Sequence, residues 1–430
     1  MKPVFLDKIA SVTRACGLKR EVRVASEIPC EEGVVVALRV LNDKSTYNQV
    51  ELPSGRMAQV KRGDVVAGAL GHRKALFGYS GHLPATLLPG DVVQLLNIGG
   101  VAGICDSINP NLGQPFDAEV LGSILTFPYL GERIGVPARV GERRLDLAAP
   151  LATHGVPVIA LVGSCMNAGK TAAACALIQE LAHRRLTVDA LKTTGVSLRR
   201  DILAMEDAGA RRTAIFTDLG VVTTTAANAP ALARALISQL ADGGHARPDL
   251  IVVEMGDGLI GTYGVDAILA APDLRDAFTA IVLAANDPVA AWGGVEILRR
   301  EYGIRPAAIT GPATDNAVGT SLIEARTGVP AINARTDAGR LAEVVLAALG
   351  PALRERLGFQ TEEETEAFIE GEALGSGLDG HSAGSGVAFD PETAGRARGA
   401  SSVRSQDATG EAGEVAVDAT AGSGGRGSER

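Results

Sequence analysis

The chain has 430 residues, more than one hydrophobic core usually organises, so we expect two or three domains. Hydrophobic residues make up 46% of the chain and aromatic residues only 3%, so the core must consist mainly of Ala, Val, Leu and Ile side chains. The formal net charge of -9 offers no concentrated basic surface, which argues against a nucleic-acid partner.

The cysteines and the N-terminus bear on where the protein works. Five cysteines are widely spread, and none forms a CxxC pair with metal-ligand spacing; they are Cys16, Cys30, Cys105, Cys165 and Cys175. This usage is typical of reduced thiols. Residues 1–8 contain no long apolar signal segment, and no run of about eighteen apolar residues occurs. We therefore expect a cytoplasmic protein with no membrane partner.

The first third of the chain has a β pattern. From about residue 20 to 150, short runs rich in β-branched residues alternate with Gly, Pro and Asp, which is typical of strands and tight turns. Segments 61–66 and 89–93 each place a Gly-Asp turn before an apolar strand. We predict that residues 1–150 form a small mainly-β domain, either a barrel or a sandwich.

A different pattern begins near residue 156. Residues 156–162 form a nearly unbroken apolar run, a glycine loop follows, and residues 172–182 show helical periodicity. Further apolar runs occur at residues 188–191, 250–253, 280–284, 307–310 and 331–332. Such runs suit strands that are buried on both faces, so we predict that residues 151–350 form an α/β domain with a parallel sheet covered by helices.

After about residue 360 the composition shifts to Gly, Ser, Ala, Glu and Arg, with few large apolar side chains. Such a segment buries too little surface to offset the entropy of ordering it. We predict that residues 360–430 form a disordered tail.

The glycine loop has the features of a P-loop that binds ATP. It runs from strand to helix, and its predicted nucleotide-binding residues are Gly163, Ser164, Asn167, Ala168, Gly169, Lys170 and Thr171. Successive backbone N–H groups at a helix N-terminus bind phosphate, and the Lys170 charge adds to them. The Thr171 hydroxyl is a ligand for Mg²⁺. The first glycine lies one residue earlier than in the common P-loop. Alternatively, the loop is only a turn.

This longer spacing resembles dethiobiotin synthetase and related SIMIBI-type P-loop proteins, whose loop reads Gly, five residues, Gly-Lys-Thr. The resemblance continues with Lys192 at the end of a strand, which implies a second catalytic lysine beside Lys170. It also implies that Asp201, which opens a helix, and Glu254, which ends a strand, bind Mg²⁺ with Thr171. Asp201 is alternatively a structural acid in the first turn of its helix.

The resemblance covers residues 156–348 and departs from the family at one loop. Gly311 follows a strand about where relatives contact the adenine ring. Met255 and Asp257 stand where the family often has glycine, so the substrate-facing loop differs. Relatives often build the site across a homodimer interface, although the sequence does not determine the oligomeric state.

The N-terminal region contains a cluster of basic, aromatic and glycine residues between positions 71 and 82. The cluster can bind an anion or a substrate, or it can be part of solvated loops; its polar members are His72, Arg73, Lys74, Tyr79 and His82. We expect this domain to complete the substrate site, because ligand sites commonly form between domains.

The sequence predicts an ATP- and Mg²⁺-dependent enzyme that phosphorylates a small-molecule carboxylate or carbamate, as ligases do. The alternative is a P-loop NTPase that acts as a switch, or as a cofactor or metal delivery factor, on a protein partner. The substrate itself is not determined by the sequence.

Deletion of residues 361–430 tests the predicted tail. We expect the melting temperature and the turnover of the shortened protein to stay within error of the full chain, because the deleted residues contribute little burial. A large fall in the melting temperature, measured by calorimetry, would show that the tail packs on the rest of the protein.

Overall fold

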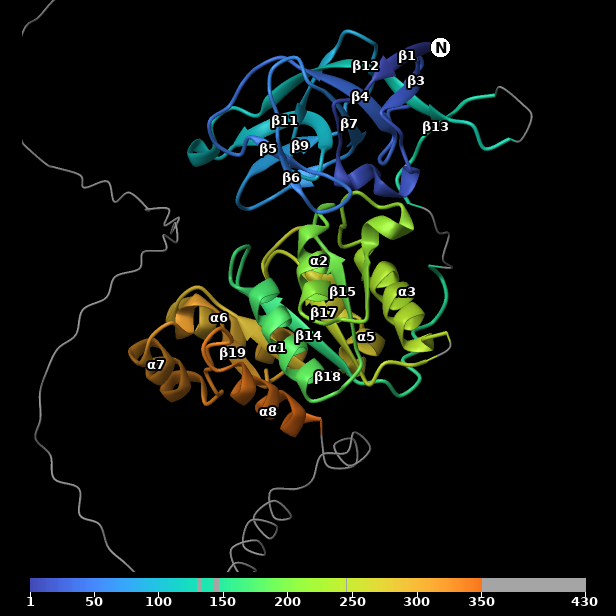
Figure 1. The fold of residues 1–430 in the computed structure, drawn as a ribbon. Coiled ribbons are helices and arrows are strands. Elements are labelled where there is room, and N and C mark those ends of the chain that lie inside the picture. The colour runs from blue at the N-terminus through green and yellow to red at the C-terminus, as the bar shows by residue number, and fades with distance from the viewer. Residues whose placement is uncertain (130–133, 142–146, 245, 350–430) are drawn as a thin grey trace, which may run out of the picture. The chain divides into compact units, whose positions relative to one another are not determined.

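The computed structural model describes residues 1–129, 134–141, 147–244 and 246–349, and all of them belong to one compact unit. The disordered tail predicted for residues 360–430 lies outside the described residues. Within the unit, a mainly-β part comprises the described residues up to 140, and an α/β part follows from residue 151 (Figure 1).

The β part is built from thirteen described strands and two short 3₁₀ helices. The strands are β1 (Lys2–Phe5), β2 (Lys8–Ile9), β3 (Glu21–Ala25), β4 (Val35–Val40), β5 (Gln49–Glu51), β6 (Met57–Gln59), β7 (Val65–Leu70), β8 (Arg73–Lys74), β9 (Tyr79–His82), β10 (Val92–Leu95), β11 (Val101–Ile108), β12 (Phe116–Thr126) and β13 (Val136–Pro137). The 3₁₀ helices are η1 (Ser11–Cys16) and η2 (Pro110–Leu112).

The strand pairings close into a barrel. Strand β12 pairs antiparallel with β4 and with β10, β4 pairs antiparallel with β7, and β7 pairs parallel with β11. Strand β11 in turn pairs antiparallel with β10, which completes the ring β12–β4–β7–β11–β10. Of the two predicted architectures, the β part therefore has the barrel. Its core contains small aliphatic side chains such as Val36, Leu38 and Val66, as the composition requires.

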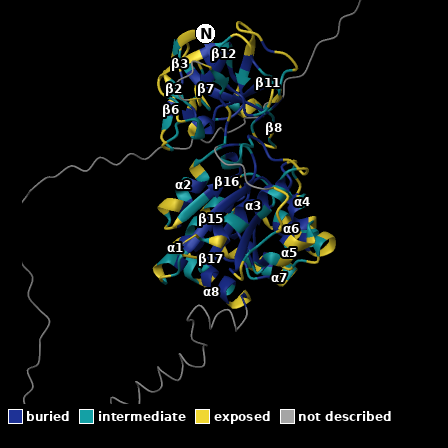
Figure 2. Cartoon of the chain, turned by 90° about the vertical axis from the view of Figure 1, so that its right-hand side faces the viewer, coloured by how far each residue is buried: buried dark blue, intermediate teal, exposed yellow. Residues whose placement is uncertain are grey.

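The α/β part contains one parallel sheet in the order β16-β15-β17-β14-β18-β19. Its strands are β14 (Val158–Gly163), β15 (Val188–Thr194), β16 (Arg212–Ile215), β17 (Leu250–Met255), β18 (Phe278–Ala284) and β19 (Ala308–Thr310). Every residue of β14, β15 and β17 is buried, which is why β14 and the first four residues of β17 appear as continuous apolar runs. Figure 2 shows the buried strands β15 and β17 in dark blue.

Helices cover both faces of this sheet (Figure 1). One apolar cluster contains side chains of α1 and α8, and a second contains side chains of α3, α4 and α6. The helices are α1 (Lys170–His183), α2 (Arg200–Asp207), α3 (Ala229–Asp242), α4 (Val265–Ala270), α5 (Pro272–Ala277), α6 (Pro288–Tyr302), α7 (Ala317–Thr327) and α8 (Ala338–Ala348), with 3₁₀ helices η3 (Phe216–Leu219) and η4 (Pro312–Thr314). None of the helices in the described ranges has the length and apolar character needed to span a bilayer.

The strands of the α/β part depart from the prediction at two places. Residues 331–332 make only a single bridge, from Ala331 to Ile309, because Pro330 has no N–H to extend the pairing. The edge strand β16 was not predicted, because its sequence Arg-Thr-Ala-Ile is short and half polar.

The β part is hydrogen-bonded to loops that follow the parallel strands. Glu32 Oε1 accepts from the N–H groups of Val222 and Thr223, at 3.0 and 2.7 Å. Asn97 Nδ2 donates to the Ser197 carbonyl at 2.8 Å. Gly99 fits against the same carbonyl, since a Cβ there would lie 2.2 Å from the Ser197 oxygen. The two parts therefore pack closely where the sheet's carboxyl-end loops lie.

Candidate active site

The glycine loop connects the central strand β14 to the start of α1. Residues 164–169 form the turn, in which Asn167 has φ 64° and Gly169 has φ 93°. Helix α1 begins at Lys170, and its first N–H groups have no carbonyl partner within the helix. This arrangement of a tight loop before a helix N-terminus is suited to binding phosphate.

The Lys170 side chain is held across the glycine loop by a backbone carbonyl of the loop. Its side chain is only 5% exposed, and Nζ donates to the Cys165 carbonyl at 2.8 Å. Burial lowers the pKa of Lys170, although Glu254 opposes the shift. Gly163 makes room for this path, because a Cβ at that position would lie 2.8 Å from Nζ. A side chain at Gly163 would therefore displace the Lys170 side chain from this path.

A buried ionic cluster lies at the carboxyl ends of β15 and β17. Lys192 Nζ forms an ion pair and hydrogen bond with Asp201 Oδ2, and it lies 4.0 Å from Glu254 Oε1. Thr171 Oγ1 donates to Glu254 Oε1 at 3.1 Å. The cluster joins β15, β17, α1 and α2, so four of the predicted site residues meet although they are up to 83 positions apart.

The pKa values of the Asp201 and Glu254 carboxyl groups are shifted in opposite directions by their surroundings. Burial favours the neutral form of both, but Lys192 outweighs it at Asp201 and lowers that pKa. At Glu254 burial dominates and raises the pKa, with Lys192 opposing the rise. Burial alone would lower the pKa of Lys192, but the charges of Asp201 and Glu254 raise it. Lys192 therefore remains a cation.

Of the three residues predicted to bind Mg²⁺, Thr171 and Glu254 can hold a nucleotide-bound ion. Thr171 and Glu254 are in contact, and Glu254 Oε2 is buried with no hydrogen-bond partner among the described residues, so it can accept a further ligand. Asp201 is engaged by Lys192. Within the described ranges, no group of three His, Cys, Asp or Glu side chains could hold a metal by itself. Mg²⁺ commonly takes one or two protein oxygens and completes its shell with phosphate and water.

These groups open onto a cavity of about 450 Å³ that both parts of the unit line. The α/β part contributes residues of the glycine loop together with Lys192, Asp201, Glu254 and Asp257. The β part contributes Tyr47, Arg73, Phe77, Gly78, Asn97, Ile98 and Leu112. The cavity is thus bounded by the glycine loop and by the β part.

Asp257 and Tyr263 are among the cavity residues that were not identified as site residues from the sequence. Asp257 has φ 74°, and neither of its buried carboxylate oxygens makes a hydrogen bond of ordinary geometry to any residue that the structure describes. Burial raises its pKa, although Lys170 opposes the shift. Burial also raises the pKa of Tyr263 to about 12, and its hydroxyl accepts from the Lys74 N–H at 3.1 Å. The only sequence signal was that Asp257 replaces a family glycine.

Some of the predicted nucleotide-binding residues line the cavity, and others lie behind the loop that lines it. Asn167, Gly169, Lys170 and Thr171 line the cavity, whereas Gly163, Ser164, Ala168 and Gly311 do not. A Cβ at Gly311 would lie 2.3 Å from the Ala168 carbonyl, so Gly311 supports the loop from behind.

Of the five polar residues singled out in the N-terminal cluster, only Arg73 lines the cavity. Tyr79 is buried and accepts from Lys44 Nζ at 2.9 Å, and His82 pairs with Asp106 at 2.7 Å on the surface. The other two are His72 and Lys74. Sequence proximity therefore did not make this cluster a single site, because alternate positions of strands point to opposite faces.

No family model and no curated protein matches the chain. Similar solved structures include a DUF1611 family protein from Anabaena variabilis, with 15% identity, TM-score 0.34, and coverage of 49% of this chain and 62% of that chain. The 54 kDa signal recognition particle protein from Aeropyrum pernix in complex with GDP has 20% identity, TM-score 0.31, and coverage of 51% of each chain. The hydrogenase maturation factor HypB from Archaeoglobus fulgidus has 13% identity, TM-score 0.32, and coverage of 46% and 91%.

The present chain spans less than two thirds of the first two of these proteins. Similarities with such low sequence identities and TM-scores assign neither a family nor a function to this chain. The resemblance to dethiobiotin synthetase stays a prediction.

Substitution of Gly311 tests its support of the loop. Gly311→Ala should destabilise the protein by about 2 kcal/mol or more, because φ is 95° and the added Cβ meets the Ala168 and Ala285 carbonyls. Gly293→Ala, inside α6 with open space around it, should instead stabilise by about 1 kcal/mol. Urea unfolding measures both, and equal effects would contradict the assignment.

The predicted Mg²⁺ ligands are tested by titration of the metal. Glu254→Gln and Asp201→Asn should each raise the Mg²⁺ concentration for half-maximal nucleotide turnover by about 10-fold or more, since each removes a carboxylate charge. Glu206→Gln changes an exposed acid on the same helix as Asp201 and should leave the titration unchanged. If both site variants respond to Mg²⁺ as the parent protein does, Glu254 and Asp201 do not bind the metal.

Proposed function

We propose that the protein is an ATP- and Mg²⁺-dependent enzyme that phosphorylates a small-molecule carboxylate or carbamate, and that the product is then captured by an amine, as in a ligase. The observation that carries the proposal is the shared cavity of about 450 Å³, in which the glycine loop faces side chains of the β part. Pockets of about 300–1,000 Å³ are typical of small-molecule sites.

The charges around the cavity suit phosphoryl transfer. The backbone N–H groups at the start of α1 and the Lys170 ammonium would hold the phosphates, and Lys192 would add a second fixed cation. Thr171 and Glu254 would hold Mg²⁺, which neutralises charge on phosphate oxygens when it is bound. These groups are fixed in advance by hydrogen bonds, so little reorganisation accompanies the reaction.

Asp257 offers a base for the second step. An amine that attacks an acyl phosphate forms a C–N bond and releases phosphate, and the nitrogen must lose a proton. Asp257 lines the cavity, and burial raises the pKa of its carboxyl group, which makes the carboxylate a better proton acceptor. Its strained backbone conformation, with φ 74°, is consistent with a functional constraint.

One observation favours the alternative of a nucleotide-dependent switch. The N–H of Arg199, at the start of α2, donates to Glu51 Oε2 of β5 at 2.8 Å. Helix α2 also carries Asp201, so a shift of the ionic cluster on hydrolysis would be transmitted to β5 in the β part. Under this alternative the barrel would be the element that binds a protein partner, and the nucleotide could equally be GTP.

Trapping of the phosphorylated intermediate distinguishes the two functions. The full chain is incubated with Mg²⁺, ATP or GTP, and hydroxylamine, together with a panel of small carboxylic acids. An acyl phosphate would be converted to a hydroxamate in proportion to the ADP formed, and Lys170→Ala should reduce this yield by about 100-fold or more. Lys61→Ala, which changes an exposed lysine of the β part, is the matched control.

The result that would sink the ligase proposal is nucleotide hydrolysis that no acid in the panel stimulates and that yields no hydroxamate. Hydrolysis that responds only to an added protein would favour the switch.

A further inference from the structure

Arg73 is a buried cation in the wall of the cavity. It lies on β8, its residue is 5% exposed, and it lines the cavity from the side of the β part. Its Nη1 donates to the Leu96 carbonyl and to the Tyr47 hydroxyl, the latter at 3.3 Å. Gly78 packs directly on the guanidinium, since a Cβ there would lie 2.4 Å from Nη2. The side chain is therefore fixed in position.

The charge of Arg73 has no counter-ion in the described part of the chain. No Asp or Glu oxygen of the described residues comes within ion-pair distance of it, and its buried Nε makes no hydrogen bond. The buried Asp189, in contrast, is paired with Arg211 and Arg212. An unpaired buried charge is unfavourable, so the site is suited to an anion from outside.

Lys170 provides an instructive comparison at the same cavity. It too is 5% exposed and forms no ion pair with the described carboxylates, and a P-loop lysine is neutralised by phosphate. Lys192, the remaining buried lysine there, is already paired with Asp201. One unpaired cation, Lys170, thus belongs to the loop, and a second, Arg73, belongs to the β part. Neutralising both of them requires two anionic groups in the cavity.

The surroundings of Arg73 favour a carboxylate on a small, partly apolar molecule. Tyr47, Phe77 and Leu112 give this wall aromatic and aliphatic surface. The guanidinium is planar and matches the two oxygens of a carboxylate. The hydroxyl of Tyr263, whose pKa is raised by burial to about 12, keeps its proton at neutral pH and can act as a further donor.

We propose that Arg73 is the specificity residue of the acceptor site and binds a carboxylate of the substrate other than the group that is phosphorylated. The acceptor is then a small molecule with two acidic groups, such as a dicarboxylate. This inference rests on the proposed phosphoryl transfer. The competing assignment is that Arg73 neutralises a phosphate of the nucleotide itself.

The test measures binding to the full chain by calorimetry, first of Mg²⁺ with the non-hydrolysable analogue AMPPNP and then, at saturating AMPPNP, of glutarate, succinate, butyrate and glutaramide. We expect a dicarboxylate to bind and neutral glutaramide not to bind. Arg73→Gln should raise the dicarboxylate dissociation constant by about tenfold or more and leave that of AMPPNP within about twofold, and Arg73→Lys should restore part of the loss.

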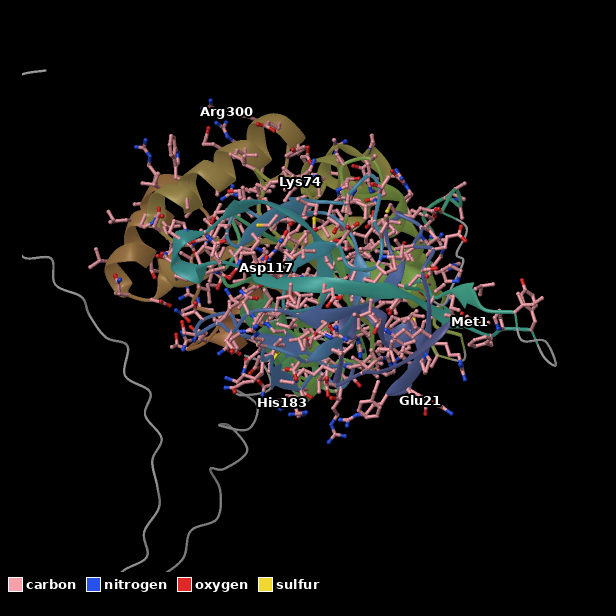
Figure 3. All side chains as sticks on the ribbon, turned by 90° about the horizontal axis from the view of Figure 1, so that it is seen from above. Met1, Glu21, Lys74, Asp117, His183 and Arg300 are labelled. Carbon is pink, nitrogen blue, oxygen red and sulfur yellow. The ribbon has the colours of Figure 1, made fainter. Side chains whose placement is uncertain are left out.

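Two further variants distinguish a loss of binding from a change in folding. Lys74→Gln removes the same charge from an exposed neighbour on the same strand, labelled in Figure 3, and should have no effect. Phe77→Glu places a negative charge beside the proposed anion site at a side chain that is 42% exposed, so it should weaken dicarboxylate binding even if Arg73→Gln does not fold.

The outcomes separate the inference from the proposed function. If AMPPNP does not bind the parent protein, the proposed function fails. If AMPPNP binds but no dicarboxylate does, or if Arg73→Gln and Phe77→Glu leave dicarboxylate binding unchanged, the inference is overturned while phosphoryl transfer stands. Loss of AMPPNP affinity in Arg73→Gln would assign the arginine to the nucleotide instead.

Discussion

The burial of Lys192 between Asp201 and Glu254 is the interaction on which the site depends. A lysine of β15 that is almost completely buried requires opposite charge nearby, and the neighbouring strand β17 and helix α2 supply it. Glu254 is held in turn by the Thr171 hydroxyl at the start of α1. Because loss of one partner would leave another charge buried and unpaired, the loop, the strand ends and α2 are fixed relative to one another.

The same requirement extends from the parallel sheet into the β part. Helix α2, which carries Asp201, begins where the Glu51 carboxylate of β5 accepts the Arg199 N–H. Asn97 and Gly99 meet the Ser197 carbonyl in the loop between β15 and α2. The β part therefore does more than line one side of the cavity, since its polar side chains also orient the helix that places an acid beside Lys192.

The contacts between the β part and α2 explain why the same site geometry supports both a ligase and a nucleotide-dependent switch. A ligase needs a second wall to exclude water and orient an acceptor, and the barrel supplies Tyr47, Arg73 and Asn97 to that wall. A switch needs an element that responds to the nucleotide, and the contact between Glu51 and Arg199 provides one. The presence of a cavity of about 450 Å³ lined by an uncompensated cation favours a small-molecule acceptor, because a protein partner would not need either feature.

The sequence by itself determined the features that are local in the chain. The strand, loop and helix around Lys170 and the apolar runs of the parallel sheet follow from short-range periodicity, and the barrel was one of two β architectures that the turns allowed. Only the tertiary structure decided that Gly311 supports the loop, that Arg73 alone of its cluster lines the cavity, and that Tyr47, Asn97 and Tyr263 join it. These outcomes depend on contacts between segments about 100 to 190 residues apart, such as Asn97 with Ser197 and Lys74 with Tyr263, which leave no periodic signal in either segment.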